Sequence, residues 1–488
     1  MLRVPAISER SGRYLISVLL LLKLLVLGWN AYAYDGRTYD EGRHEDRAVF
    51  AGLRPGELAY DPPLYYLPAG LATLPDGVTR AERFAAEVEA PRGKRARIGK
   101  TERAFRAHLL DLLRYSNLLW VGGFYLGWIG YALPRLLGGF GDRWFLASLL
   151  LLTLPGFQKV AAMSHPENLL LAASTLSTCV WLRLREGGVQ RPELWLAGFA
   201  LATALVGLTR PTALVPVIVF TALGLVYARR LAGPTPSRWL PRAAALVLLV
   251  AAVSGSWYFI RYQRTGAVTE FMTQEAAERA RASKAGFNYA GYFVSFRAKP
   301  LLATPHDGMG GEPDADGRVP RQDSFFTVLY SDVWGDHWLS FSGPKHREGK
   351  LWPKRTILTL ALLLPSLLAL LLGFWARCAV TQARALWRAT PGGAGARLAQ
   401  LGASLELELV LLSWSALGAL LFVCWQAGPA LLPGDQHSIK FIHVASLFAP
   451  ATALLFMREL PKPVTTLLAA YLLLLYCAAF PVAMYWPA

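Results

Sequence analysis

The chain has 488 residues, of which 54% are hydrophobic and only 17% are charged. This composition is too apolar for a water-soluble protein of this length and predicts an integral membrane protein. Lys and Arg total 50 against 33 Asp and Glu, a net charge of +17. The four cysteines stand alone, without Cys-x-x-Cys spacing, which argues against both a metal cluster and a disulfide framework.

Apolar runs predict about eleven transmembrane helices, because each run can cross a hydrocarbon core of about 30 Å. A few of these helices would be short or tilted. Two of the crossings must meet at a break near Thr209-Arg210-Pro211, since the residue before a proline is biased out of helix. If those two form one crossing, the count is ten. The predicted spans are 14–33, 112–134, 144–157, 167–182, 194–209, 212–228, 243–263, 356–376, 405–425, 441–457 and 464–484.

The distribution of charge predicts the orientation. With a cytoplasmic N-terminus, the inside segments carry 18 basic and 5 acidic residues. The two large loops are nearly neutral, with 13 basic and 13 acidic residues in 30–111, and 13 and 11 in 264–355. The positive-inside rule therefore accounts for most of the basic excess, and we expect no nucleic-acid partner. The inside segments are 1–13, 135–143, 183–193, 229–242, 376–404 and 458–463.

Five carboxylates fall within residues 35–46, directly after the first predicted span, and a helix at 101–113 is predicted near the end of the same loop. A carboxylate partly shielded from water can be tuned toward the operating pH, so this segment is a candidate site for a general base. On a helix, Asp40 and His44 would share a face. The same acids also fit a solvated loop in which they pair with neighbouring arginines.

A second motif, Tyr60-Asp61-Pro62-Pro63-Leu64-Tyr65, follows the acidic segment. The Asp40-Glu41 pair together with this Pro-Pro-Leu-Tyr segment resembles the first outer loop of the GT-C superfamily of polyprenyl-phosphate-sugar glycosyltransferases. The likeness is strongest to the protein mannosyltransferase and aminoarabinose transferase branches. The span count and the two large loops are compatible with that superfamily. Asp61 departs from the commonest motif, which has His or Lys before the two prolines.

The resemblance implies that Asp40 is the catalytic base, with Glu41 as its substitute. In such enzymes an acceptor nucleophile displaces the lipid phosphate directly at the anomeric carbon, with inversion, while the base takes the acceptor's proton. Glu167, which follows Pro166 at the start of a predicted span, resembles the second acidic residue of these enzymes. Its alternative role is to complement the helix dipole. The substrate-binding candidates of this region are His44, Asp61, Tyr65 and His165.

A lipid phosphate at the membrane surface needs cations, and an arginine near an apolar span is costly unless it finds an anion or a polar partner. Interfacial snorkelling is the alternative for each such residue. His437 and Lys440 fall near one helical face in a late loop that resembles the donor-phosphate region of the superfamily. The donor-binding candidates are Arg210, Arg261, His437 and Lys440.

The second large loop contains Trp334 and Asp336 in a Trp-Gly segment that resembles one found in some GT-C enzymes. Its tryptophans fit sugar stacking and equally a membrane-interface belt. Oxygen and imidazole ligands also suit Mn²⁺ or Zn²⁺. The mannosyltransferase-like branches are generally metal-independent, so we expect no cofactor. The residues considered for a divalent metal are Asp40, His44, His165 and Glu167.

We therefore expect an all-α polytopic membrane protein, with one GT-C-like domain over 1–488 and large outer loops at 30–111 and 264–355. The expected activity transfers a sugar from a polyprenyl-phosphate donor to a protein, lipid or glycan acceptor. The expected location is the outer face of a plasma membrane, the bacterial inner membrane. A transporter or lipid flippase is the alternative, for which Glu406 and Glu408 are the main acids within a span. A noncatalytic assembly subunit is a third interpretation.

Overall fold

The computed structural model describes residues 8–33, 63–72, 100–153, 166–210, 213–232, 236–265 and 462–483, with single residues at 380, 384, 405 and 408. Every regular element in these segments is a helix. The elements are α1 (Glu9–Ala33), the 3₁₀-helix η2 (Pro63–Tyr65), α3 (Leu67–Ala72), α5 (Lys100–Tyr125), the π-helix η4 (Leu126–Ala132), α6 (Leu133–Leu137), α7 (Asp142–Thr153), α9 (Glu167–Glu186), α10 (Pro192–Gly207), α11 (Leu214–Ala232), α12 (Pro236–Thr265) and α23 (Lys462–Ala483).

By length and composition, three helices of the described segments are able to cross a membrane: Glu9–Ala33, Leu214–Ala232 and Ser237–Gln263. Two shorter apolar helices cover Pro192–Gly207 and Pro463–Cys477. The expectation of an all-helical membrane protein is confirmed for this part of the chain. The predicted spans 356–376 and 441–457 lie outside the described residues, as does 405–425 except for Leu405 and Glu408.

The predicted break near Arg210 is confirmed, because α10 ends at Gly207 and α11 begins at Leu214. The helix expected at 101–113 is confirmed as the first part of α5. It forms one continuous helical run with the span expected at 112–134, α5 followed by η4 and α6. No glycine or proline interrupts residues 100–121, so nothing in the sequence stops the helix where the loop was expected to end.

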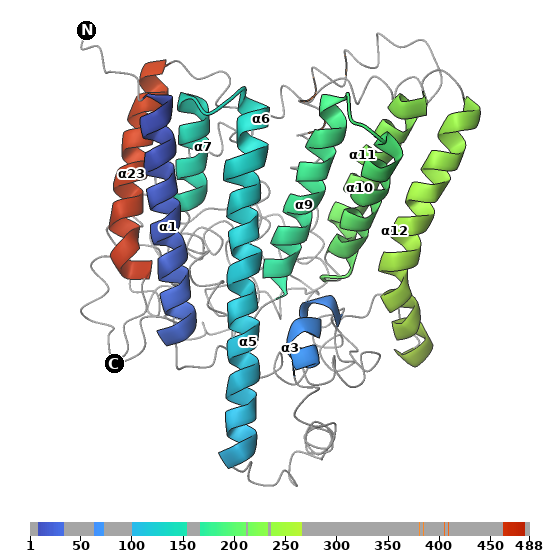
Figure 1. The fold of residues 1–488 in the computed structure, drawn as a ribbon, viewed down its shortest axis with the longest axis horizontal. Coiled ribbons are helices and arrows are strands. Elements are labelled where there is room, and N and C mark those ends of the chain that lie inside the picture. Colours follow the sequence, from blue (N-terminus) through green and yellow to red (C-terminus); the bar gives the residue numbers. More distant parts are fainter. Residues whose placement is uncertain are drawn as a thin grey trace, which may run out of the picture.

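The helices form a bundle in which α5 lies between two groups (Figure 1). On one side α1 packs against α5 and α7, and α23 packs against α7. On the other side α9 packs against α5, α10 and α11, and α10, α11 and α12 pack against one another. The core between them is apolar, with large fully buried side chains such as Trp128, Trp181 and Phe199.

Short connections define the two ends of the bundle. The links at 138–141 and 187–191 lie at one end, which we call the Arg135 end, together with the end of α11 and the start of α12 (Figure 1). Both links start at glycines, Gly138 and Gly187, whose positive φ values of 79° and 72° stop α6 and α9. Helices α9 and α11 begin at the opposite end, which we call the Glu167 end, and α10 and α12 finish there.

Candidate functional site

A buried ion pair connects the start of α9 with the end of α10 at the Glu167 end. Arg210, just beyond α10, donates through Nη1 to Oε1 of Glu167, the first residue of α9. The two side chains are only 11% and 3% exposed. The carboxylate also lies at the positive end of the α9 dipole. Charges buried to this extent are tolerated because each compensates the other.

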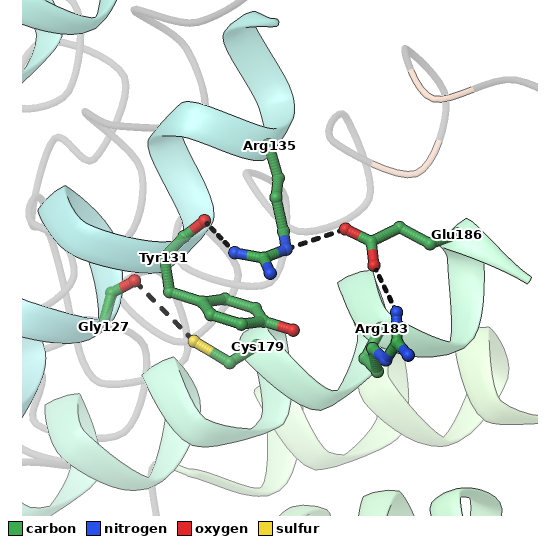
Figure 2. Close-up of polar contacts among 6 residues, drawn as sticks. All are labelled: Gly127, Tyr131, Arg135, Cys179, Arg183 and Glu186. Carbon is green, nitrogen blue, oxygen red and sulfur yellow. Dashed lines mark hydrogen bonds and ion pairs between the residues drawn. The ribbon is translucent and has the colours of Figure 1, made fainter. Parts of the chain in front are cut away.

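The relative position of α5 and α9 follows from the contacts drawn in Figure 2. The sulfur of Cys179 lies 3.7 Å from the carbonyl oxygen of Gly127. About two turns further along each helical run, Nε of Arg135 lies 2.7 Å from Oε1 of Glu186. Because the residue numbers rise together, α5 and its continuation run parallel to α9.

This parallel arrangement fixes which part of α5 lies level with the ion pair. Glu167 lies roughly three turns before Cys179, and Tyr115 lies the same number of residues before Gly127. Both helices rise about 1.5 Å per residue, so both positions are about 18 Å from the Gly127–Cys179 contact. The ion pair at the start of α9 is therefore level with the turn of α5 around Tyr115.

Tyr65 of the Pro-Pro-Leu-Tyr segment belongs to the same level. Its hydroxyl donates to Oδ1 of Asn117 at 2.9 Å, and both residues are fully buried. Its ring packs edge to face on Tyr66, with 5.0 Å between the ring centroids. Since Asn117 follows Tyr115 by two residues, the hydrogen bond and the ion pair occupy one layer of the bundle. Tyr65 stays a predicted substrate-binding residue, but its hydroxyl serves a contact between segments.

Among the buried polar residues that were not sequence-based candidates, Arg114, Asn117 and Asn168 belong to this level and are 3%, 0% and 0% exposed. The signal for the first two was present, because they are polar positions near the start of a predicted apolar span, where a polar side chain needs a partner. We call the whole set the polar layer. It consists of Tyr65, Arg114, Asn117, Glu167, Asn168 and Arg210.

Arg261, the second described donor-binding candidate, lies near the end of α12. It is 4% exposed, and its guanidinium carbon is 5.7 Å from the ring centroid of Trp257, a cation–π geometry. At Gly207, the last residue of α10, a Cβ would come within 2.5 Å of Oγ of Ser254. Arg261 lies about two turns beyond that contact, so it belongs to the Glu167 end.

The other candidates lie outside the described residues, so their relation to the polar layer stays a prediction. Of the residues considered for a divalent metal, only Glu167 is described. No group of three or more His, Cys, Asp or Glu side chains in the described segments is placed to hold a metal ion. The undescribed candidates are Asp40, Glu41, His44, Asp61, His165, Trp334, Asp336, His437 and Lys440.

The Arg135 end has a separate set of contacts (Figure 2). The guanidinium of Arg135 lies 3.5 Å above the ring centroid of Tyr131, and Glu186 accepts from Arg135 and, at 3.0 Å, from Arg183. These charged side chains are more than a third exposed. They lie in the last turns of α6 and α9, where cations complement the helix dipole. This cluster ties two helix ends together.

Glu408, one of the two acids relevant to a transporter, is also at the Arg135 end. It is fully buried and accepts from Nε of Arg185 at 3.1 Å and from the Tyr227 hydroxyl at 3.0 Å. Arg230 in turn lies 3.5 Å from that hydroxyl. These contacts hold Glu408 against α9 and α11.

Comparisons with known proteins show distant similarity only. No protein-family model and no curated protein sequence matches this chain. The chain is similar to a crystal structure of ArnT from Cupriavidus metallidurans bound to undecaprenyl phosphate, with 12% identity, a TM-score of 0.36, and coverage of 96% of this chain and 76% of that one. It is similar to ArnT in the apo state with 15% identity, a TM-score of 0.33, and coverage of 92% and 78%.

Proposed function

We propose that this chain is a glycosyltransferase of GT-C type, which transfers a sugar from a polyprenyl-phosphate donor at the Glu167 end of its bundle. The main observation in support is the position of Tyr65. Tyr65, at the end of the motif that carries the sequence resemblance, is hydrogen-bonded to α5 at the level of the buried Glu167–Arg210 pair. Two features that are distant in the sequence thus fall in one layer.

The proposed chemistry is a single displacement with inversion. The acceptor nucleophile forms a bond to the anomeric carbon as the bond from that carbon to the phosphate oxygen breaks. Asp40 takes the acceptor's proton, with Glu41 as the substitute base, and the polyprenyl phosphate leaves with the bonding electron pair. General-base assistance of this kind contributes about 10² to 10⁴ in rate. Glu167 supplies the second carboxylate of the site.

The departing phosphate needs positive charge in a poorly hydrated place. The charge of Arg210 is balanced by Glu167, so Arg210 acts together with that carboxylate. We assign the direct contacts with the donor phosphate to Arg261, His437 and Lys440. The proposal includes no resident metal or cofactor.

The proposed location is the plasma membrane, the bacterial inner membrane, with the Glu167 end facing outward. The charge distribution supports this orientation. The segments assigned to the cytoplasmic side carry 18 basic and 5 acidic residues, as the positive-inside rule requires. The acceptor is a protein, a lipid or a glycan that reaches the outer surface.

The test is transfer by the purified protein in nanodiscs, with a panel of polyprenyl-phosphate sugars. We expect Asp40→Asn to lower turnover by about 10² to 10⁴ while donor binding stays within a few-fold, because the amide keeps the shape but cannot accept the proton. Glu41→Gln should be milder. If Glu41 is the base, the order of the two variants is reversed.

The matched control is Asp111→Asn, which makes the same chemical change at an exposed position of α5 and should leave turnover unchanged. Wild-type turnover in Asp40→Asn, Glu41→Gln and their combination would contradict the catalytic assignment. A flippase would instead move a labelled polyprenyl-phosphate lipid between leaflets without making a product. Turnover unchanged by EDTA is the expected result for the metal-free mechanism.

A further inference from the structure

The hydrogen bond between Tyr65 and Asn117 connects a short segment between two predicted spans to the middle of a long helix. The two residues are 52 positions apart in the chain, and both are completely buried. A buried amide or hydroxyl without a hydrogen-bonding partner costs free energy, so a polar pair at this depth is kept only where it is satisfied. If close packing were the only requirement, phenylalanine at position 65 and leucine at position 117 would satisfy it.

The bond also has a defined place in the bundle. Asn117 lies within one turn of the level that the parallel register of α5 and α9 assigns to Glu167. The segment held there is the end of the Pro-Pro-Leu-Tyr motif, which continues into α3, and α3 itself packs against α5. The contact therefore sets the level of Tyr65, the end of the motif, relative to the start of α9.

We propose that Asn117 and Tyr65 are positioning residues of the active site, which act by holding the motif segment at the level of Glu167. This inference rests on the proposed function. Without the hydrogen bond, η2 and the following α3 gain freedom relative to Glu167 and Arg210. A loss of alignment of about 1 Å at a reacting centre lowers rates by up to about 100-fold.

The key variant is Tyr65→Phe, which removes the hydroxyl and keeps the ring, and Asn117→Leu removes the acceptor. The matched control is Tyr476→Phe, because the Tyr476 hydroxyl is also buried and donates to the carbonyl oxygen of Leu19 at 2.8 Å, between α23 and α1. Each protein is purified in nanodiscs, and its melting temperature, its donor dissociation constant and its kcat are measured.

We expect both tyrosine variants to lose similar thermal stability. Only Tyr65→Phe should lower kcat, by about 10- to 100-fold, with donor affinity within about 3-fold. The Tyr65→Phe, Asn117→Leu double variant should have a kcat within about 3-fold of the poorer single variant, because the hydrogen bond that each change removes is the same one. A Tyr65→Phe variant with the stability loss and the unchanged kcat of Tyr476→Phe would overturn the inference.

A distance measurement keeps this inference separate from the proposed function. Spin labels at Leu71→Cys on α3 and Tyr115→Cys on α5, both at exposed positions, are placed in a background without the native cysteines. We expect a narrow distance distribution that Tyr65→Phe broadens and Tyr476→Phe does not. If no donor supports transfer by the wild-type protein, the proposed function fails, and the spin-label distances still decide whether the hydrogen bond positions the segment. An unchanged distribution in Tyr65→Phe refutes it.

Discussion

Two of the Arg–Glu pairs between the described helices differ in burial, and their surroundings determine what each contributes. Glu167 and Arg210 are 3% and 11% exposed, so losing one partner leaves the other charge buried. Glu193 and Arg242 join α10 to α12 at the Arg135 end and are 58% and 24% exposed, so water screens that pair. The same two residue types therefore support different predictions.

Replacing one member of the buried pair should be costly, and replacing both should be less so. We expect Glu167→Gln or Arg210→Gln alone to lower the free energy of unfolding by about 3 to 5 kcal/mol. The double variant should recover part of that loss, because it removes both charges of the pair. Glu193→Gln is the exposed control and should cost at most about 1 kcal/mol. Chemical denaturation in detergent measures these differences, and equal losses for Glu167→Gln and Glu193→Gln would contradict them.

The exposed pair predicts a small pH dependence. The pKa of Glu193 is lowered by a hydrogen bond from its own backbone N–H and by Arg242. A carboxyl group with a lowered folded-state pKa stabilises the protein above its unfolded value of about 4.3, and that contribution is lost as the pH falls through the folded-state pKa. The melting temperature of the wild-type protein should exceed that of Glu193→Gln slightly at pH 6, and the difference should disappear in acid. A difference in melting temperature that grows as the pH falls would contradict this prediction.

At the scale of the elements, the approach of η4 to α9 depends on a single glycine. A Cβ at Gly127 would overlap Cγ2 of Thr175 on α9, whereas nothing lies within 4 Å of a Cβ at Gly130 in the same π-helix. The Thr175 hydroxyl donates to the carbonyl oxygen of Leu171 at 2.7 Å, so its methyl group faces the π-helix as a fixed contact.

Gly127→Ala should therefore lower the free energy of unfolding by about 1 to 3 kcal/mol, the usual cost of overpacking. Gly130→Ala is the matched control and should have no such cost, because its Cβ meets open space. Thr175→Ser removes the methyl group and keeps the hydroxyl, so it should suppress the defect of Gly127→Ala. Thermal unfolding of the two single variants and the double variant measures this, and a Gly130→Ala defect as large as that of Gly127→Ala would contradict the steric argument.

Local sequence signals were sufficient for the break at Arg210 and for Glu167 at the start of α9. Pro211 interrupts the helix, and Pro166 followed by an acid is a helix-start pattern. The π-helix at 126–132 and the level of Asn117 relative to Glu167 were not predictable in this way. Both depend on how two helices pack. The hydrophobic periodicity of a sequence does not show how far one helix is shifted along its axis relative to its neighbour.

At the scale of the whole molecule, the charge count and the fold agree on which segments share an end. The connections at 138–141 and 187–191 and the end of α11 fall within segments that the sequence assigned to one side, and they lie together at the Arg135 end (Figure 1). The start of α1 is also there, because Arg13 lies 4.4 Å above the ring of Phe140. The sequence thus predicted the grouping, while the pairing of Glu167 with Arg210 required the folded bundle.

Which end faces the cytoplasm is testable by cysteine labelling. Single cysteines are introduced into a background without Cys179, Cys378, Cys424 and Cys477. Gln190→Cys reports on the Arg135 end, since Gln190 is exposed in the link between α9 and α10. Ser283→Cys and Thr101→Cys report on the two segments predicted to be outside.

An excess of Lys and Arg keeps a segment on the cytoplasmic side during insertion. A membrane-impermeant maleimide applied to intact cells should therefore label Ser283→Cys and Thr101→Cys and leave Gln190→Cys unlabelled until the membrane is opened. Labelling of Gln190→Cys in intact cells, with the other two protected, would place the Glu167 end in the cytoplasm. The proposed donor site would then face the compartment of soluble nucleotide sugars, and the polyprenyl-phosphate assignment would lose its topological basis.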